Sequence, residues 1–260
     1  MLEFAHDAPV VLLSPHFDDA LLSCWALLAK DDREILVVNV FAGAPGSGVR
    51  GDWDSRVGLS RLDRLRGRDS AWLVRQRAAE DRDALAGVGR TAVNLSLLDA
   101  QYRRCPAHGL PDNSSDEIMA ELFREVPRAS AALLPAAIAP SDAETHRDHL
   151  LVRSLLGPLG SFGGPVQLYA DLPYAARAGW PGWVTGNAGS PEAESAWERA
   201  LQAVGLRLDA VAPDVRELST DDQERKRNAL EGYRTQWKSL EVLRDELRFE
   251  VLLPVDVGTA

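Results

Sequence analysis

Two short polar clusters in the sequence carry side chains that can bind a metal ion. They are His16, Asp18 and Asp19 in "PHFDDA", and His146, Asp148 and His149 in "HRDH". Zinc accepts histidine nitrogens and carboxylate oxygens, and a catalytic zinc keeps three protein ligands and one open position. A set such as His16, Asp19 and His149 would meet that count. We therefore expect one Zn2+ per chain, although another divalent metal would accept similar ligands.

The other polar residues of the clusters suggest hydrolytic chemistry. Neighbouring residues at a turn between a strand and a helix point in different directions, so Asp18 and Asp19 are not both expected to bind one ion. The carboxylate that does not bind the ion can act as general base toward a water molecule. His146 lies three residues before His149, a spacing that can place both on one side of the site. It could donate a hydrogen bond to an oxyanion on the substrate.

Each cluster taken alone has a simpler explanation. Asp18 or Asp19 could cap a helix N-terminus, where aspartate accepts hydrogen bonds from free backbone amides. His146 and His149 could be surface residues ahead of a helix. The two clusters together favour a metal site, because both follow buried strands and few other functions explain such residues at both places.

The apolar pattern predicts the elements that bring the clusters together. Strands are expected at residues 10–14, 34–41, 92–95, up to about 135, 166–169 and 249–253, and helices at 20–30, 72–86, 116–126, 149–156, 195–204 and 221–247. This alternation is typical of an α/β fold with a mostly parallel sheet between two helical layers. Ligands bind such sheets outside the carboxyl ends of the strands. Both clusters lie there, so we expect the metal site at the C-terminal edge of the strands.

Length, composition and charge favour one acidic globular domain over residues 1–260, with a core at about 8–172 and a C-terminal addition at about 173–260. The net charge of −10 disfavours nucleic acid as a partner. Cys24 and Cys105 cannot form a disulfide scaffold at this size. The N-terminus lacks the positive charge of a signal peptide, and its apolar run is too short to span a bilayer. We expect a cytoplasmic protein with no membrane partner, and the oligomeric state stays open.

The two motifs resemble those of the LmbE-like or PIG-L family of zinc-dependent N-deacetylases. That family's first motif usually reads Pro-His-Pro-Asp-Asp-Glu and its second His-x-Asp-His; here they are "PHFDDA" and "HRDH". The resemblance implies a Rossmann-like three-layer αβα fold. It also implies removal of an acyl group, usually acetyl, from amino sugars such as N-acetylglucosamine and from their conjugates.

Carried over residue by residue, the resemblance makes His16, Asp19 and His149 the zinc ligands, Asp18 the general base and His146 the partner of the tetrahedral intermediate. Weaker similarity lies in "RAAEDRDALAGVG", with Arg77 and Glu80, and in "KRNALEGYRTQ", with Lys226, Tyr233 and Gln236.

Two positions depart from the family pattern. Phe17 replaces the usual proline and Ala20 the usual glutamate. The ligands and the base are kept, so we expect activity to survive, while substrate preference can differ.

Arg75, Arg77 and Asp99 are the candidate substrate-binding residues. The arginines from Arg50 to Arg82 could form a lid that grips an anionic or glycosidic substrate, or a solvated face with internal ion pairs. We expect ion pairing for most of them, with Arg75 and Arg77 as exceptions. Asp99 follows the third strand, where it could orient a ligand histidine, bind substrate hydroxyls or cap the loop.

Two further sets of residues have weaker functional interpretations. Cys105 and His108 form a CxxH pair that lacks two ligands for a second metal, so we discount it. Tyr174, Trp180 and Trp183 could stack on a sugar or an acyl chain, or anchor a long loop.

The function that the sequence favours is therefore that of a zinc-dependent hydrolase, which removes an N-acyl group from an amino sugar or a glycosylated small molecule. Two alternatives remain. The metal could serve another reaction, such as hydrolysis of a thiol-conjugate amide or of a phosphoester, or the fold could serve a non-catalytic sugar binder.

Overall fold

A seven-stranded sheet forms the centre of the protein, in the order β4-β3-β2-β6-β7-β9-β8. The computed structural model describes residues 2–103, 114–236 and 247–255. Its strands are β1 (Glu3–Phe4), β2 (Val10–Ser14), β3 (Ile35–Asn39), β4 (Thr91–Asn94), β5 (Arg128–Ala129), β6 (Ala131–Pro135), β7 (Val166–Tyr169), β8 (Asp214–Glu217) and β9 (Phe249–Val255). The short strands β1 and β5 pair with each other outside the main sheet.

Helices cover the sheet and fill the connections between its strands. They are α1 (Asp19–Lys30), α2 (Arg61–Leu65), α3 (Ser70–Gly87), α4 (Ser114–Glu125), α5 (Arg147–Arg153), α6 (Leu156–Gly160), α7 (Tyr174–Ala178), α8 (Gly182–Thr185), α9 (Pro191–Gln202) and α10 (Thr220–Leu230). A π-helix, η1 (Asp54–Gly58), and two 3-10 turns, η2 (Asp142–Glu144) and η3 (Leu208–Ala210), complete the set. Within the described part of the chain, no helix is both long and apolar enough to cross a bilayer.

The central strands are parallel and buried, as their unbroken apolar sequences predict. Every residue of β2 is buried, and β2 pairs in parallel with β3 on one side and with β6 on the other. Strands β4 and β7 extend the parallel region outward, and β9 pairs antiparallel with both β7 and β8. The predicted α/β fold with a mostly parallel sheet is confirmed.

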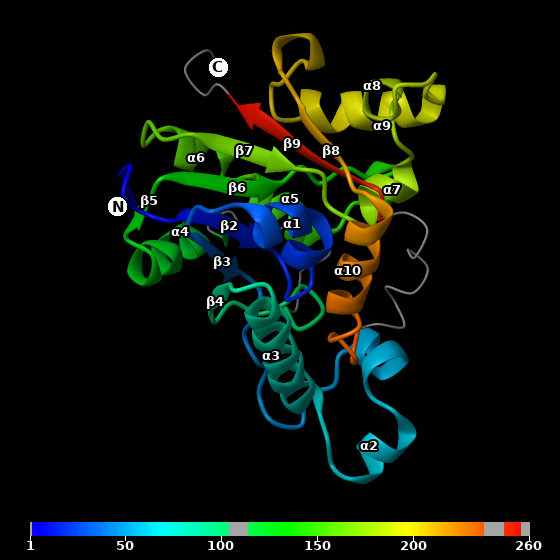
Figure 1. The fold of residues 1–260 in the computed structure, drawn as a ribbon. Coiled ribbons are helices and arrows are strands. Elements are labelled where there is room, and N and C mark those ends of the chain that lie inside the picture. The colour runs from blue at the N-terminus through cyan, green and yellow to red at the C-terminus, as the bar shows by residue number, and fades with distance from the viewer. Residues whose placement is uncertain (1, 104–113, 237–246, 256–260) are drawn as a thin grey trace.

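The order in which the chain adds strands to the sheet reverses between β2 and β6. From β2 it moves outward through β3 to β4, and it then returns to place β6 on the opposite side of β2. Right-handed crossovers therefore put α1 and α3 on one face and α5 and α6 on the other. Figure 1 shows α10 beside α1 and α3, in front of the sheet. Such a switch point leaves a crevice at the carboxyl ends of the strands, where ligands bind.

Most of the predicted elements occur. The helix predicted over 149–156 is instead divided into α5 and α6, α2 was not predicted, and the other main differences lie in the C-terminal part. Strands β2 and β7 have the predicted bounds, and α1 and α3 differ by one or two residues at their ends. The helix predicted over 221–247 is wrong at residues 231–236, because α10 ends at Leu230 and the chain turns from Glu231 to Gln236. Residues 237–246 lie outside the described part. The short, polar strand β8 was not predicted, and it pairs only at the sheet edge.

A buried ion pair joins this C-terminal part to α1. Helix α1 is kinked at Cys24, which frees the backbone amides of Trp25 and Ala26. The carboxylate of Glu250 in β9 accepts both amides at 2.9 Å, and Lys226 of α10 donates to the same carboxylate at 2.7 Å. Both charged residues are buried. The C-terminal strand thus supplies the hydrogen-bond acceptor that the kinked helix lacks.

Lys226→Met is expected to lower the free energy of unfolding by about 3–5 kcal/mol, because it leaves the charge of Glu250 buried without its partner. Urea denaturation would measure the loss. Lys30→Met is the matched control: Lys30 pairs with Asp222 at 2.6 Å on the surface, and its loss should cost less than about 1 kcal/mol. Equal costs for the two variants would contradict the role given to the buried pair.

Candidate metal centre

The loop after β2 is held in shape by its own polar groups. Ser14 donates from its hydroxyl to the carbonyl of His16 at 2.6 Å and accepts the amide of Ala20 at 3.0 Å. The amide of His16 donates to the Asp19 carboxylate at 2.8 Å. The apolar strand therefore ends in a compact turn that presents His16, Asp18 and Asp19 at the edge of the sheet.

The carboxylate of Asp19 lies between two imidazoles from distant parts of the chain. Its Oδ2 is 3.1 Å from Nδ1 of His16 and 3.3 Å from Nε2 of His149. Burial alone would raise the pKa of Asp19, but the charge and hydrogen bonding of His149 and His16 outweigh it and hold the pKa far below its usual range. The structure thus brings the three predicted ligands into contact.

The far side of His149 is fixed by Asp171, which lies two residues after the end of β7. Its Oδ2 lies 2.7 Å from Nδ1 of His149, and both side chains are buried. With Nδ1 donating to Asp171, Nε2 faces Oδ2 of Asp19 at 3.3 Å. Burial tends to lower the pKa of His149, yet Asp19 and Asp171 raise it to about 9. This site attracts positive charge, and the donor set fits a divalent metal as well as a proton.

The other predicted ligand histidine, His16, is held in a similar way. Its Nε2 lies 3.1 Å from Oδ2 of Asp148 and 3.8 Å from Oδ2 of Asp99. Asp148 also accepts the amide of Ala100 at 3.0 Å and forms an ion pair with Arg103. Burial opposes protonation of His16, but Asp148 and Asp19 raise its pKa well above the ordinary value. Each imidazole thus has one nitrogen on a supporting carboxylate and the other facing Asp19.

Ligand-type atoms also gather in two overlapping groups here. In each group one atom per residue lies within 4.8 Å of the others; the groups are His16, His146 and His149, and His16, Asp99 and Asp148. The second group has its carboxylate Asp148 already paired with Arg103. The first group adds His146 to the two histidines that face Asp19.

Asp18 stands at the N-cap position of α1, but its side chain makes no capping hydrogen bond. It is half-buried and lines the cavity in front of the cluster. Burial, together with the neighbouring charge of Asp19, raises the pKa of Asp18 to about 6. A carboxylate with this pKa is ionised at neutral pH and can accept a proton, which is the property a general base needs.

His146, by contrast, does cap a helix. Its Nδ1 accepts the amide of Asp148 at the start of α5, at 3.2 Å. Its ring lies 4.8 Å from that of His16 and 5.4 Å from that of His149, centre to centre. Burial, together with the positive charges of His16 and His149, lowers the pKa of His146 to about 4. A neutral His146 with Nδ1 occupied carries its proton on Nε2 and is a hydrogen-bond donor.

A cavity of about 610 Å³ opens in front of these groups. Its wall combines the cluster with aromatic side chains, namely Phe17, Phe41, Trp53, Tyr102 and Tyr174. This volume lies within the usual range for small-molecule sites, in which apolar walls surround a few polar groups. Phe17, which replaces the family's proline, therefore contributes to the wall of the cavity.

The three predicted substrate-binding residues differ in position. Asp99 and Arg77 line the cavity. Arg77 lies 3.3 Å from the buried Asp54, so much of its charge is neutralised inside the protein. Arg75 is exposed on α3 and is not among the described residues that line the cavity. Asp99 also accepts the amide of Gln101 at 2.9 Å, so it caps its loop as well as approaching His16.

The three aromatic residues predicted to stack on substrate or to anchor a loop have different positions. The ring of Tyr174 lies 5.0 Å from that of His149 and 6.2 Å from that of His146. Trp180 and Trp183 instead pack on Trp197 of α9, at 5.6 and 5.3 Å. Cys105 and His108 lie outside the described residues.

Two site residues, Asp148 and Asp171, had no predicted role. Asp171 follows a strand end, so the rule that located Asp99 could have located it. The contact of Asp148 with His16 joins residues 132 positions apart and has no signal in the sequence.

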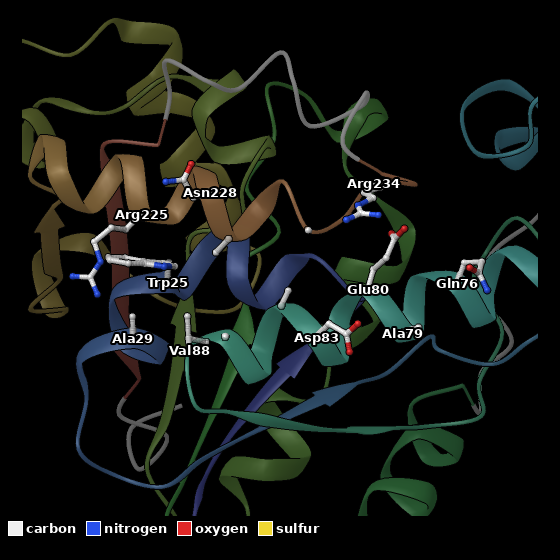
Figure 2. A pocket seen from close by; sticks show the side chains of 14 residues that line it. Trp25, Ala29, Gln76, Ala79, Glu80, Asp83, Val88, Arg225, Asn228 and Arg234 are labelled. Carbon is white, nitrogen blue, oxygen red and sulfur yellow. The ribbon is translucent and has the colours of Figure 1, made fainter.

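A second hollow of about 920 Å³ lies between α1, α3 and α10 (Figure 2). Trp25, Glu80, Asp83, Arg225 and Arg234 are among the residues of its wall. It contains none of the predicted site residues. The size of a cavity therefore does not identify the candidate site. The cavity of about 610 Å³ is smaller, but it contains the cluster of histidines and carboxylates.

Behind Asp18, a buried carboxylate joins α3 to the C-terminal part. Asp81 accepts hydrogen bonds from the Tyr233 hydroxyl and from the Asn39 amide, both at 2.7 Å. Burial raises the pKa of Asp81 to about 7 despite these bonds, and the charge of Asp18 adds to the rise.

Comparison with known proteins places both clusters in one family model. The model of the PIG-L family, described as GlcNAc-PI de-N-acetylase, matches residues 11–157. A curated relative, the 2'-N-acetylparomamine deacetylase of Niallia circulans, is 28% identical over 190 residues, which are 63% of this chain. The match spans 66% of that relative's length, just under two thirds.

Solved structures of deacetylases share the whole fold. The crystal structure of a deacetylase of an antimicrobial pseudoaglycone has a TM-score of 0.67 and 25% identity, covering 98% of this chain and 99% of that one. The zinc-inhibited form of a teicoplanin deacetylase has a TM-score of 0.64 and 23% identity, covering 95% and 97%. The second likeness concerns the fold alone.

Asp171→Ala is expected to weaken binding of a divalent metal about 10- to 100-fold, because His149 loses the carboxylate that orients it. Titration of Zn2+ against a competing chelator would measure this. Asp171→Asn keeps an acceptor for Nδ1, so its zinc affinity should lie between those of Asp171→Ala and the wild type. Asp142→Ala, at an exposed position, is the control. Unchanged zinc affinity in a folded Asp171→Ala protein would contradict the positioning role.

Asp81→Asn is expected to flatten the pH dependence of stability. The folded protein keeps a proton on Asp81 that the unfolded chain releases above about pH 4. This stabilising contribution is complete below that pH and is lost as the pH rises to about 7. From pH 5 to 7 the wild type should lose about 2–3 kcal/mol relative to the variant. Urea denaturation at several pH values would test this. Asp83→Asn, at an exposed site, should leave the pH dependence of the unfolding free energy unchanged. If Asp81→Asn also left it unchanged, the raised pKa of Asp81 would be refuted.

Proposed function

Because the chain belongs to the PIG-L family of GlcNAc-PI de-N-acetylases, we propose that it is a metal-dependent hydrolase that removes an N-acyl group from an amino sugar. Acetyl is the proposed acyl group. The amino sugar is free or part of a glycosylated small molecule, in keeping with the curated relative, which is named for N-acetylparomamine.

One observation carries this proposal. Nε2 of His149 and the Asp19 carboxylate face each other at 3.3 Å, and Nδ1 of His149 is held by Asp171. An imidazole nitrogen and a carboxylate oxygen this close together attract a cation, which is either a proton or a metal ion. We propose His16, Asp19 and His149 as the ligands of one Zn2+ per chain, because two nitrogens and one carboxylate leave a fourth position open. Another divalent metal would suit the same donors.

The chain's own residues then divide the remaining work. A divalent metal at the site supplies Lewis acidity, which lowers the pKa of water to about 7 and polarises a carbonyl group. Asp18 takes the proton from the attacking water as the new C–O bond forms. His146 donates from Nε2 to the carbonyl oxygen as it gains negative charge. When the C–N bond breaks, Asp18 returns the proton to the leaving amine nitrogen.

The cavity supports a substrate larger than an acetylated amine. Its volume of about 610 Å³ can admit a sugar together with part of a larger molecule. Its aromatic side chains offer apolar faces for a sugar ring. Asp99 can accept hydrogen bonds from substrate hydroxyls, and Arg77 can donate hydrogen bonds to substrate oxygens. Arg75 remains a predicted contact that would need a substrate reaching beyond the cavity. The cytoplasmic location also stays a prediction.

The activity can be tested with a panel of N-acetylated amino sugars, aminoglycosides and glycopeptides, by following release of free amine. The metal-loaded chain should release amine from at least one class. Removal of the metal with a chelator should abolish release, and Zn2+ should restore it. Release of product only from thiol-conjugate amides or phosphoesters would contradict the proposal.

Asp18→Asn is expected to lower kcat by about 10²–10⁴-fold while the protein still binds its metal, because an amide cannot accept the proton. Metal content per chain and kcat on the best substrate are the two measurements. Asp209→Asn, at an exposed surface position, is the control for both. Full turnover in Asp18→Asn would remove Asp18 from the role of base.

A further inference from the structure

The segment from Val49 to Arg68, here called the basic arm, exposes apolar side chains to an unusual degree. The exposed large hydrophobic residues of the described chain all lie in it, and they are Val49 (40% exposed), Trp53 (52%), Leu62 (64%) and Leu65 (76%). The last two are three residues apart on α2, so they share one side of that helix. Figure 1 shows α2 projecting away from the sheet.

Helix α2 of the arm is well formed although it packs on little. No residue of α2 is buried. Ser60 and Asp63 form a capping box at its start, and Arg68 pairs with Asp63 and lies over the ring of Trp72 at 4.1 Å. Local polar contacts thus hold a short helix that presents leucines to solvent. Burying these leucines against something else would be favourable by more than 1 kcal/mol each, on the order of 1.5–3 kcal/mol when complete.

The arm is also basic, in a protein that is strongly acidic. It contains six arginines and three aspartates, whereas the whole chain has a net charge of −10. Two of the aspartates are already paired, Asp54 with Arg77 and Asp63 with Arg68. The exposed arginines that form no ion pair with any described residue are Arg50, Arg56, Arg61, Arg64 and Arg66.

We propose that the basic arm docks the protein onto an anionic lipid bilayer. Each leucine of α2 has an arginine beside it in the sequence, as in "RLDRLR". An arginine can lay its aliphatic part along apolar surface and keep its guanidinium among phosphate groups. Protein interfaces, in contrast, need a broad face that matches the partner in shape. A bilayer accepts single apolar side chains without shape complementarity, and it attracts each nearby arginine.

The charge distribution also sets the direction of approach. The acidic body is repelled by an anionic surface while the arm is attracted, so the protein would meet the bilayer with the arm first. Docking through exposed side chains needs no membrane-spanning segment. The sequence-based expectation of no membrane partner considered only a spanning or secreted chain.

Trp53 connects this surface with the candidate metal centre, because it belongs to the arm and also lines the cavity. A docked arm would hold the cavity close to the lipid surface, where amphiphilic glycosides collect. This consequence rests on the proposed function, whereas the docking itself does not.

Flotation of the full-length chain with lipid vesicles tests the docking. Vesicles of phosphatidylcholine mixed with phosphatidylglycerol should carry the protein upward at low salt, and those of phosphatidylcholine alone should not. High salt should weaken the binding. Replacement of Arg61, Arg64 and Arg66 by Gln should weaken it about 100-fold, and Leu62→Ser with Leu65→Ser more than about tenfold. Arg33→Gln with Arg207→Gln, at exposed paired positions, is the matched control and should bind as the wild type does.

Three results would overturn the proposal. The first is equal binding to neutral and anionic vesicles, or no binding to either. The second is unchanged binding by the arm variants. The third is self-association of the wild type in the absence of lipid that the leucine variant abolishes, because the arm would then be a contact between copies of this chain. Since Leu62 and Leu65 are exposed, an unchanged melting temperature should show that the variant is folded, and release of amine from a water-soluble substrate gives a separate test of the proposed function.

Discussion

The carboxylate of Asp19 is buried where water cannot solvate it, and a buried charge is costly unless other groups compensate it. His16 and His149 provide that compensation, and each of them is held in turn by a carboxylate, Asp148 or Asp171. The result is an alternation of acids and imidazoles that is stable only as a unit. Its three carboxylates outnumber its two imidazoles, so the unit takes up positive charge, either as protons on the histidines or as a metal cation.

This chain of contacts explains several features of the fold. Its members follow β2, β6 and β7, so those strands must be neighbours in the sheet with their carboxyl ends together. The parallel pairing of β2 with β6 and of β6 with β7 provides this. The C-terminal part then supports the same region from behind, because Glu250 binds the kinked α1 and Tyr233 binds Asp81. A disturbance in α10 or β9 therefore reaches the helix that begins with Asp19.

The surface around the cavity is divided by charge and polarity. Inside, acids and imidazoles balance one another and Arg77 is neutralised by Asp54. At the base of the arm, Trp53 borders the cavity, and beyond it unpaired arginines and exposed leucines face outward. Polar chemistry and apolar contact are therefore kept on adjoining but separate surfaces. A molecule with a sugar at one end and an apolar part at the other could contact both.

The sequence by itself determined the elements and the two clusters, because both signals are local. Apolar runs marked β2 and β3, and polar residues that follow buried strands marked His16, Asp18, Asp19, His146 and His149. Local signals could not choose between Arg75 and Arg77, which lie two residues apart on α3 and so face different sides. Only the tertiary structure gave Arg77 its partner Asp54 and set Arg75 in solvent. The same holds for the supports of the two histidines, since Asp148 and Asp171 act through contacts between segments 132 and 22 positions apart. Such contacts depend on strand order and register, which no short stretch of sequence encodes.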